Sequence, residues 1–244
     1  MTVTQATFLL DVKRHAMTVH HDDGVYRHLS FCQPDHRWLY RFDIVTWPGA
    51  LCIRGDVGTY AFSRLHDMFE FFRSPMTTAE RIDINEDYWA EKLIASDCSG
   101  RRGSGAMRFD PDLFSAEVKR RYVEHIRSRM REEPDKRRKL RLALEDDVLA
   151  YAEAGEAEAM RAACEFEHDG FVLRDFWEAH VHGYTSQFVW SLYAIAWAIW
   201  TYDNRPSTRG MSPAAPEPTA PAPAPRGPAF GPAPQPRPSK RGNA

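Results

Sequence analysis

The sequence predicts an α+β fold in which a four-stranded antiparallel β-meander packs against several α-helices. Three observations lead to this prediction. Between residues 25 and 65, apolar residues alternate with polar ones, which is the period of a half-buried strand. The interruptions in that stretch are short, and short connections join antiparallel neighbours. After residue 67, apolar residues recur every three or four positions, which is the period of an amphipathic helix.

The N-terminal segment has helical spacing, because Phe8, Leu9, Val12 and Ala16 fall on one side of a helix over residues 5–17. The sequence HHDDG then interrupts this pattern. Four strands are predicted after it, joined by turns at 33–37, 48–49 and 55–58: VYRHLSFC (25–32), WLYRFDIVTW (38–47), ALCIR (50–54) and TYAFSRL (59–65).

The second of these strands carries apolar residues on both faces. Alternation places Phe42 and Ile44 on one face, and Val45 and Trp47 on the other. We therefore expect helices to cover the first face and at least part of the second.

Helical segments follow the strands. The sequence HDMFEFFR (66–73) predicts a helix, and Asn85 is a candidate N-cap for a helix with Trp89 and Leu93 on its apolar side. Residues 99–105, SGRRGSG, predict a flexible loop. Asp110 and Pro111 then begin a long helix that reaches Met130.

Two further helices are predicted after Pro134, one reaching Tyr151 and one over residues 156–166. Residues 171–182 fit either a strand or a helix. The last helix, from Tyr184 to Tyr202, has no charged residue in 19 positions, which is long enough to span a membrane. Polar residues and tryptophans inside the run favour a buried core helix instead.

A change of composition divides the chain into a single α+β domain, 1–204, and a tail, 205–244. The tail holds 12 of the 17 prolines and carries six Lys/Arg against one Glu, whereas residues 1–204 carry 26 basic and 33 acidic residues. The tail has too little apolar surface to fold, so we expect it to be disordered.

The spacing of cysteine and histidine argues against a metal centre or a disulfide framework. The four cysteines form no CxxC pair, which favours free thiols in a cytoplasmic protein. His180 and His182 share a face only if their segment is a strand, and no third ligand stands at a diagnostic spacing. We expect no cofactor and no metal.

The sequence RGDVGTY (54–60) is the best candidate for a ligand site, because backbone N–H groups of a glycine-rich turn can bind phosphate. It lacks the spacing of a phosphate-binding loop and leads into a strand, so a tight hairpin turn is the favoured interpretation. If this end of the sheet binds a ligand, the candidate residues are Arg54, Gly55, Asp56, Gly58, Arg64 and Asp67.

No pattern of a catalytic nucleophile and base is present, so no catalytic residue is assigned and an enzyme is the less favoured class. Residues 119–141 hold 11 of the 32 Lys/Arg, which is typical of nucleic-acid binders. The acidic residues between them favour a solvated helical hairpin with salt bridges, so nucleic acid is the weaker candidate partner.

The segments FDIVTWPGALCIRGDVGTYAFSRLHDMFEFFR, INEDYWAEKL and LYAIAWAIWTYD resemble a family of uncharacterised proteins encoded by tailed phages and prophages. The resemblance covers roughly residues 25–100 and 184–203. Val57 departs from it, because Met is usual at that position. It implies a phage-derived protein in the host cytoplasm, and it assigns no activity and no catalytic residue.

Two functions follow as hypotheses. The first is a non-enzymatic phage accessory factor that binds a host or phage protein and acts on a host or defence component. The alternative is a small enzyme or binding protein for a nucleotide or another phosphorylated ligand at the Gly55–Gly58 turn. The arrangement of Asp56, Arg64 and Asp67 distinguishes them, because a ligand site needs these residues to converge on a hollow.

Overall fold

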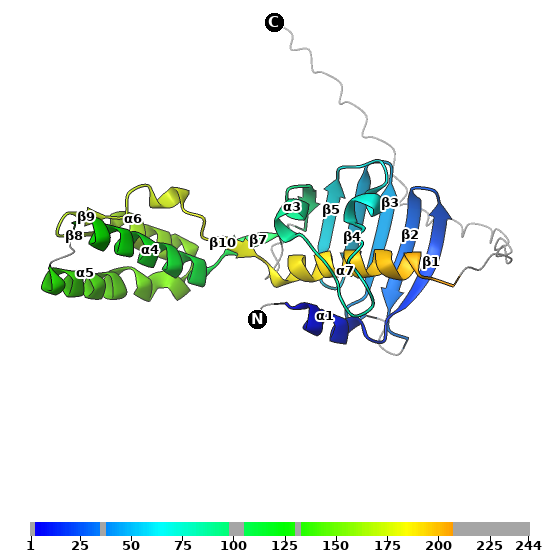
Figure 1. Cartoon of the computed structure of the whole chain (residues 1–244), viewed down its shortest axis with the longest axis horizontal. Helices are drawn as coiled ribbons and strands as arrows, with labels where there is room; N and C mark the ends of the chain where they lie inside the picture. Colours follow the sequence, from blue (N-terminus) through cyan, green and yellow to red (C-terminus); the bar gives the residue numbers. More distant parts are fainter. Residues whose placement is uncertain (1–2, 35–37, 98–104, 130–132, 207–244) are drawn as a thin grey trace, which may run out of the picture. The chain divides into compact units, whose positions relative to one another are not determined.

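The computed structural model describes residues 3–34, 38–97, 105–129 and 133–206. The chain divides into a unit of residues Met1–Arg205 and a unit of residues Pro206–Ala244. Most of the predicted loop at 99–105 and nearly all of the predicted tail lie outside the described residues. The first unit has two hydrophobic cores, one in a sheet body and one in a helical body, and each body is described by itself (Figure 1).

The sheet body is built on an antiparallel meander, as predicted, but the sheet has six strands where four were expected. The strands are hydrogen-bonded in chain order: β1 (Ala16–Asp23), β2 (Tyr26–Cys32), β3 (Phe42–Trp47), β4 (Ala50–Gly55), β5 (Thr59–Ser63) and β6 (Leu93–Ser96). The four predicted strands correspond to β2–β5. Both additional strands are at the edges of the sheet.

The edge strands escaped prediction because they bury little apolar surface. In β1 every residue except Met17 is exposed, so no apolar alternation marks the strand. The strand begins at Ala16, within the predicted N-terminal helix 5–17, which ends at Val12, and it includes the first four residues of HHDDG, the segment expected to interrupt the pattern. Its hairpin to β2 turns at Gly24, whose φ is +60°. The segment of β6 was assigned to a helix, but α3 (Glu86–Ala90) ends before Leu93 reaches the sheet.

One face of the sheet is the core of this body. Four helices contribute to it: α1 (Gln5–Val12), α2 (Met68–Phe72), α3 and α7 (Ser186–Asp203), of which α7 crosses the strands (Figure 1). The strands contribute the residues predicted to share a face in β3, including the fully buried Ile44. Aromatic rings meet at the centre, as where Phe42 stacks on Phe31 at 4.7 Å between centroids.

Among the described residues of the sheet body, the second face lacks the helix predicted to cover it. Val45, Cys52 and Ala61 point to it and are half-buried, while Trp47 is 41% exposed. None of these side chains belongs to the core that the four helices of the sheet body form. The apolar residues on this face are therefore few and small apart from Trp47, and they did not require a helix above them.

Helix α7 is a core helix, as predicted. Thr185 caps its N-terminus through a bond from the Phe188 N–H at 3.2 Å, and half of its residues are buried, among them Ile195 at 0% exposure. Among the described residues, no helix is long and apolar enough to cross a membrane.

The helical body lies between β7 (Met107–Phe109) and β10 (His182–Tyr184), which pair with each other. It contains α4 (Pro111–Arg129), α5 (Pro134–Asp147), the 3₁₀ turn η1 (Leu149–Ala154), α6 (Glu156–Glu165), the two-residue strands β8 (Glu167–His168) and β9 (Phe171–Val172), and the 3₁₀ turn η2 (Phe176–Glu178). The predicted cap of α4 is present, because Asp110 accepts from the Asp112 N–H at 2.8 Å. The undecided segment 171–182 is thus neither one helix nor one strand.

Candidate functional site

The structure separates the six candidate ligand residues into two groups at opposite ends of β4 and β5. The register pairs Arg54 with Thr59 and Ala50 with Ser63. Gly55 and Asp56 therefore lie at one end, whereas Arg64 and Asp67 follow β5 at the other. The strands are about 13 Å long between these pairs, at roughly 3.3 Å per residue. The six residues do not converge on one site.

The first end of the sheet is hollowed. A depression of about 420 Å³ is lined by Trp38, Arg41, Asp43, Arg54, Gly55 and Asp56. Three of these residues come from the predicted RGDVGTY segment, and the other three come from the connection between β2 and β3 and from β3 itself. We call this depression the turn hollow.

Gly55 and Asp56 hold a neighbouring β-turn, Trp38–Arg41. The turn is closed by a bond from the Arg41 N–H to the Trp38 carbonyl at 3.3 Å, and the Arg41 carbonyl accepts from the Asp56 N–H at 2.9 Å. A Cβ on Gly55 would stand 2.1 Å from that same carbonyl oxygen. Only glycine permits this approach, so the RGDVGTY segment serves first as a support for the Trp38–Arg41 turn.

Tyr40, inside this turn, has a left-handed backbone with φ +53°. Its N–H donates to the Asp56 carboxylate at 3.0 Å, and its carbonyl lies 3.0 Å from Nε2 of His15. Its ring stacks on Trp190 of α7, with 5.6 Å between centroids. Burial and the nearby carboxylates of Asp11 and Asp56 raise the pKa of the Tyr40 phenol. Each of these contacts fixes the turn against the sheet body.

The tip of the turn is apolar and open to solvent. Trp38 is 77% exposed and Leu39 is 52% exposed. The Arg41 guanidinium lies 5.7 Å from the centre of the Trp38 ring, within the range of a cation–π contact. A rigid turn therefore displays a tryptophan, a leucine and an arginine together.

The carboxylates of the turn hollow are already engaged by neighbouring groups. Asp43 pairs with Arg41 at 3.6 Å and accepts a short hydrogen bond from the Ser30 hydroxyl. The Asp56 carboxylate accepts a hydrogen bond from the Tyr40 N–H. Among the described residues Arg54 forms no ion pair, although Asp43 lies opposite it in the register. Arg54 is thus the cation of the hollow that remains available for an added group.

Ser30 also lies 2.8 Å from Nε2 of His20, which brings a serine, a histidine and an aspartate together. Ser30 is only 7% exposed, and its hydroxyl donates to Asp43 rather than to the histidine. A nucleophilic serine gives its proton to a histidine base and must reach a substrate. This geometry favours a polar link between β1, β2 and β3 over a catalytic arrangement.

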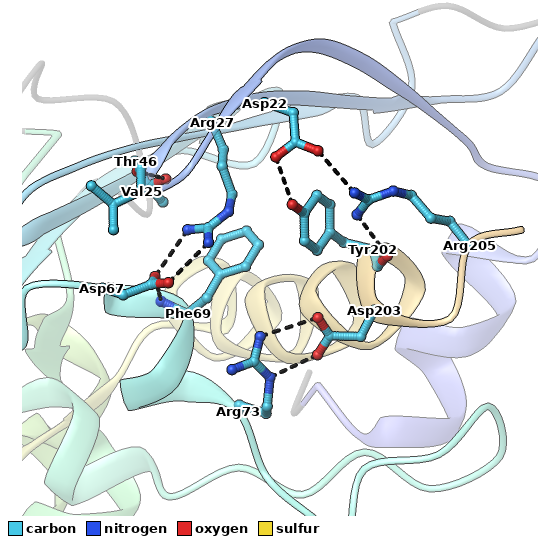
Figure 2. A network of polar contacts seen from close by, with 10 residues as sticks. All are labelled: Asp22, Val25, Arg27, Thr46, Asp67, Phe69, Arg73, Tyr202, Asp203 and Arg205. Atoms are coloured by element: carbon cyan, nitrogen blue, oxygen red, sulfur yellow. Dashed lines mark hydrogen bonds and ion pairs between the residues drawn. The ribbon is translucent and has the colours of Figure 1, made fainter. Parts of the chain in front are cut away.

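At the opposite end of the sheet, Asp67 belongs to a network of arginines and carboxylates (Figure 2). Arg27 is 9% exposed and donates to both Asp67 oxygens at 2.9 Å, and its guanidinium lies 4.5 Å from the Phe69 ring centre. Asp67 also accepts from the Phe69 N–H and so caps α2. Burial opposes ionisation of Asp67, but the bond from Arg27 holds the pKa of that carboxyl below its usual value.

The same network ties the end of α7 to its surroundings (Figure 2). Asp22 of β1 accepts from the Tyr202 hydroxyl at 2.6 Å and from Arg205 at 2.8 Å, and Arg73 forms a two-pronged pair with Asp203 at 2.7 and 3.1 Å. All these charges are paired within the network, which therefore clamps α7, α2 and the β1–β2 hairpin together. Asp67 thus has a structural task in this network.

The described residues contain no group of three or more His, Cys, Asp or Glu side chains that could hold a metal ion. His182 lies 3.0 Å from Glu156, and His180 lines a separate polar depression with Arg121 and Arg174. His180 and His182 therefore belong to no metal-binding group among the described residues.

Trp38, Tyr40 and Arg41 escaped prediction as site residues, because WLYR was taken as the start of a strand. One signal was available: Trp38 and Leu39 are adjacent apolar residues, which strand alternation does not explain.

No family model matches the sequence, and neither a curated protein nor a solved structure matches it.

Proposed function

We propose that this chain is a non-enzymatic protein-interaction factor that docks through the Trp38–Arg41 turn. The observation that carries the proposal is the combination of exposure and fixation: Trp38 is 77% exposed on a turn that Asp56, His15 and Trp190 hold in place. Single exposed apolar side chains are common, but adjacent ones held on a fixed turn are typical of an interaction site.

The physical argument concerns the cost of binding. A left-handed conformation at a residue other than glycine costs about 1–2 kcal/mol, and the contacts of Tyr40 offset that cost before any partner arrives. A preorganised turn loses little conformational entropy on docking. Tryptophan and arginine are also the residue types that dominate the binding energy of protein interfaces.

The resemblance to phage and prophage proteins supports a partner in the bacterial cytoplasm, either a host protein, such as a defence component, or another phage protein. Such a partner would receive the Trp38 ring in an apolar pocket, with an acceptor near Arg41. The proposal needs no catalytic residue and no cofactor.

A second candidate function is supported by Arg54. This guanidinium lines the turn hollow beside Trp38 and forms no ion pair among the described residues. A nucleotide or another phosphorylated ligand would place its phosphate at Arg54 and an aromatic base on Trp38. The volume of about 420 Å³ lies in the range of small-molecule sites.

The experiment is affinity purification of the tagged protein from phage-infected cells, with wild type, Trp38→Ala and Trp177→Ala in parallel. Trp177 is 66% exposed in the helical body, so its substitution removes a comparably accessible indole elsewhere. We expect one protein to co-purify with wild type and with Trp177→Ala but not with Trp38→Ala. Equal recovery with all three variants would refute the docking surface.

Calorimetric titration with ATP and with inorganic phosphate tests the second candidate. Binding that Arg54→Gln abolishes, together with an unchanged set of co-purifying proteins in Trp38→Ala, would replace the first proposal with the second. If neither ATP nor phosphate binds, the ligand site is refuted.

A further inference from the structure

Five cations stand where α4 meets α5 in the helical body. Arg127 and Arg129 are in the last turn of α4, and Arg137, Arg138 and Lys139 are in the first two turns of α5. Arg129 and Pro134 are five positions apart in the chain, so their Cα atoms are at most ~18 Å apart. The Tyr122 hydroxyl of α4 donates to the Arg137 carbonyl at 3.1 Å, which brings the two helices together. We call these five cations the basic cluster.

Two described acidic residues of this region pair with cations outside the cluster. Glu124 pairs with Arg120 at 2.6 Å, and Glu133 pairs with Lys136. Within residues 105–129 and 133–206, no side chain of the basic cluster forms an ion pair. The predicted salt bridges of this helical hairpin are present at Arg120, Arg121, Lys136 and Arg141. Among the described residues they are absent at the five cations of the basic cluster.

Helix stability does not account for the cluster in α5. Cations are favoured in the last turn of a helix, where Arg127 and Arg129 lie, and disfavoured in the first turn, where Arg137 lies. Arg137 and Arg138 also stand four and three residues before Arg141, and like charges at these spacings destabilise a helix. Asp135 stands three and four residues before Arg138 and Lys139 and offsets part of this repulsion. Arg127, Arg129, Arg138 and Lys139 are nevertheless exposed, so the cluster presents positive charge to solvent.

We propose that the basic cluster binds the phosphate backbone of nucleic acid. A polyanion is the partner that suits a group of solvent-accessible cations with no ion pair among the described residues. The net charge of −2 for the whole chain does not oppose this, because charges farther than about 8 Å away are screened at physiological salt.

An anionic membrane is the rival polyanion. Surface-binding helices set large apolar side chains beside their cations, so that these enter the bilayer. Residues 127–129 and 133–139, RSR and EPDKRRK, contain no large apolar residue. Val123 and Leu142 are exposed one turn away, at 39% and 42%, which is far less apolar surface than a helix of this kind inserts. The chemistry of the cluster therefore favours phosphates in water over phosphates at a lipid surface. This site is in the helical body and does not depend on the protein-docking turn.

The test measures fluorescence anisotropy of a labelled 20-base-pair DNA duplex and of its single strand, with the full-length chain between 50 and 200 mM NaCl. Five phosphate contacts predict a slope of about −4.5 for log K against log salt, or roughly a 500-fold loss of affinity over this range for the duplex. The double variant Arg138→Gln, Lys139→Gln removes two contacts, so the slope should fall to about −2.7 and the loss to roughly 40-fold.

The matched control is Arg120→Gln, Arg161→Gln, which removes the same charge from two exposed guanidiniums that are already ion-paired. We expect its slope and affinity to equal those of wild type, and circular dichroism verifies that both variants are folded. Equal slopes in the cluster variant and the control would overturn the proposal. So would binding to vesicles of phosphatidylcholine and phosphatidylserine without binding to either DNA, and so would no binding to DNA at all.

Discussion

Gly55→Ala tests the support that the RGDVGTY segment gives to the Trp38–Arg41 turn. The new Cβ would stand 2.1 Å from the Arg41 carbonyl oxygen and 2.7 Å from the Phe42 Cα, where ordinary contacts begin at 3.4 Å. Both neighbours are backbone atoms, so no side chain can rotate away and the strands must separate by about 1 Å.

The magnitude follows from two contributions. Overpacking of this kind costs about 1–3 kcal/mol. Moving the Arg41 carbonyl also weakens its bond from the Asp56 N–H, which contributes about 0.5–1.5 kcal/mol. The free energy of unfolding should therefore fall by about 2–4 kcal/mol, which lowers the melting temperature by roughly 5–15 °C for a unit of this size.

The measurement is thermal and urea unfolding followed by circular dichroism, with Gly49→Ala as the matched control. Gly49 has φ +84°, and a Cβ added there would meet nothing within 4 Å, so alanine adds only backbone strain of about 1 kcal/mol. If Gly55→Ala melts no lower than Gly49→Ala, the close approach does not hold the turn and the reasoning is refuted.

Four further outcomes are expected. Asp56→Asn keeps an acceptor for the Tyr40 N–H, so its melting temperature should match wild type; a drop of several degrees would show that the charge matters. Ile195→Asp buries a carboxylate in α7 and should cost about 5 kcal/mol, measured by urea unfolding. Asp67→Ala leaves the Arg27 charge buried and should cost about 3 kcal/mol, with part of the loss recovered when Arg27→Met is added. Bonds from Arg120 and Arg121 lower the pKa of Glu117 to about 2 from 4.5, against the opposing effect of burial. The stability that Glu117 contributes is therefore complete above pH 4.5 and is lost as the pH falls through 2. In Glu117→Gln the melting temperature should depend less on pH over that interval.

Part of the candidate site could be predicted and part could not. Gly55 and Asp56 were identified from local pattern alone, because glycine and aspartate in a short connection indicate special backbone geometry. Their contact with Arg41 joins positions more than ten residues apart, and no local pattern reports which carbonyl comes to lie beside a glycine. For the same reason Arg64 and Asp67 were grouped with Asp56, although the antiparallel register sends them to the opposite end of the sheet.

The sequence by itself determined the elements that bury an apolar face. Strands β2–β5 and helices α4 and α7 were predictable, because burial of one face imposes a period of two on a strand and of about 3.6 on a helix. The edge strands β1 and β6 have little buried surface, so only pairing with β2 and β5 makes them strands. Ion pairs within one helix follow from the sequence, because residues three or four positions apart face each other, as Glu117 and Arg120 do. Only tertiary structure decided the ion pairs between different elements. These depend on distances between side chains far apart in the chain, and the fold paired Arg27 with Asp67 while Arg54 and the basic cluster have no ionic partner among the described residues.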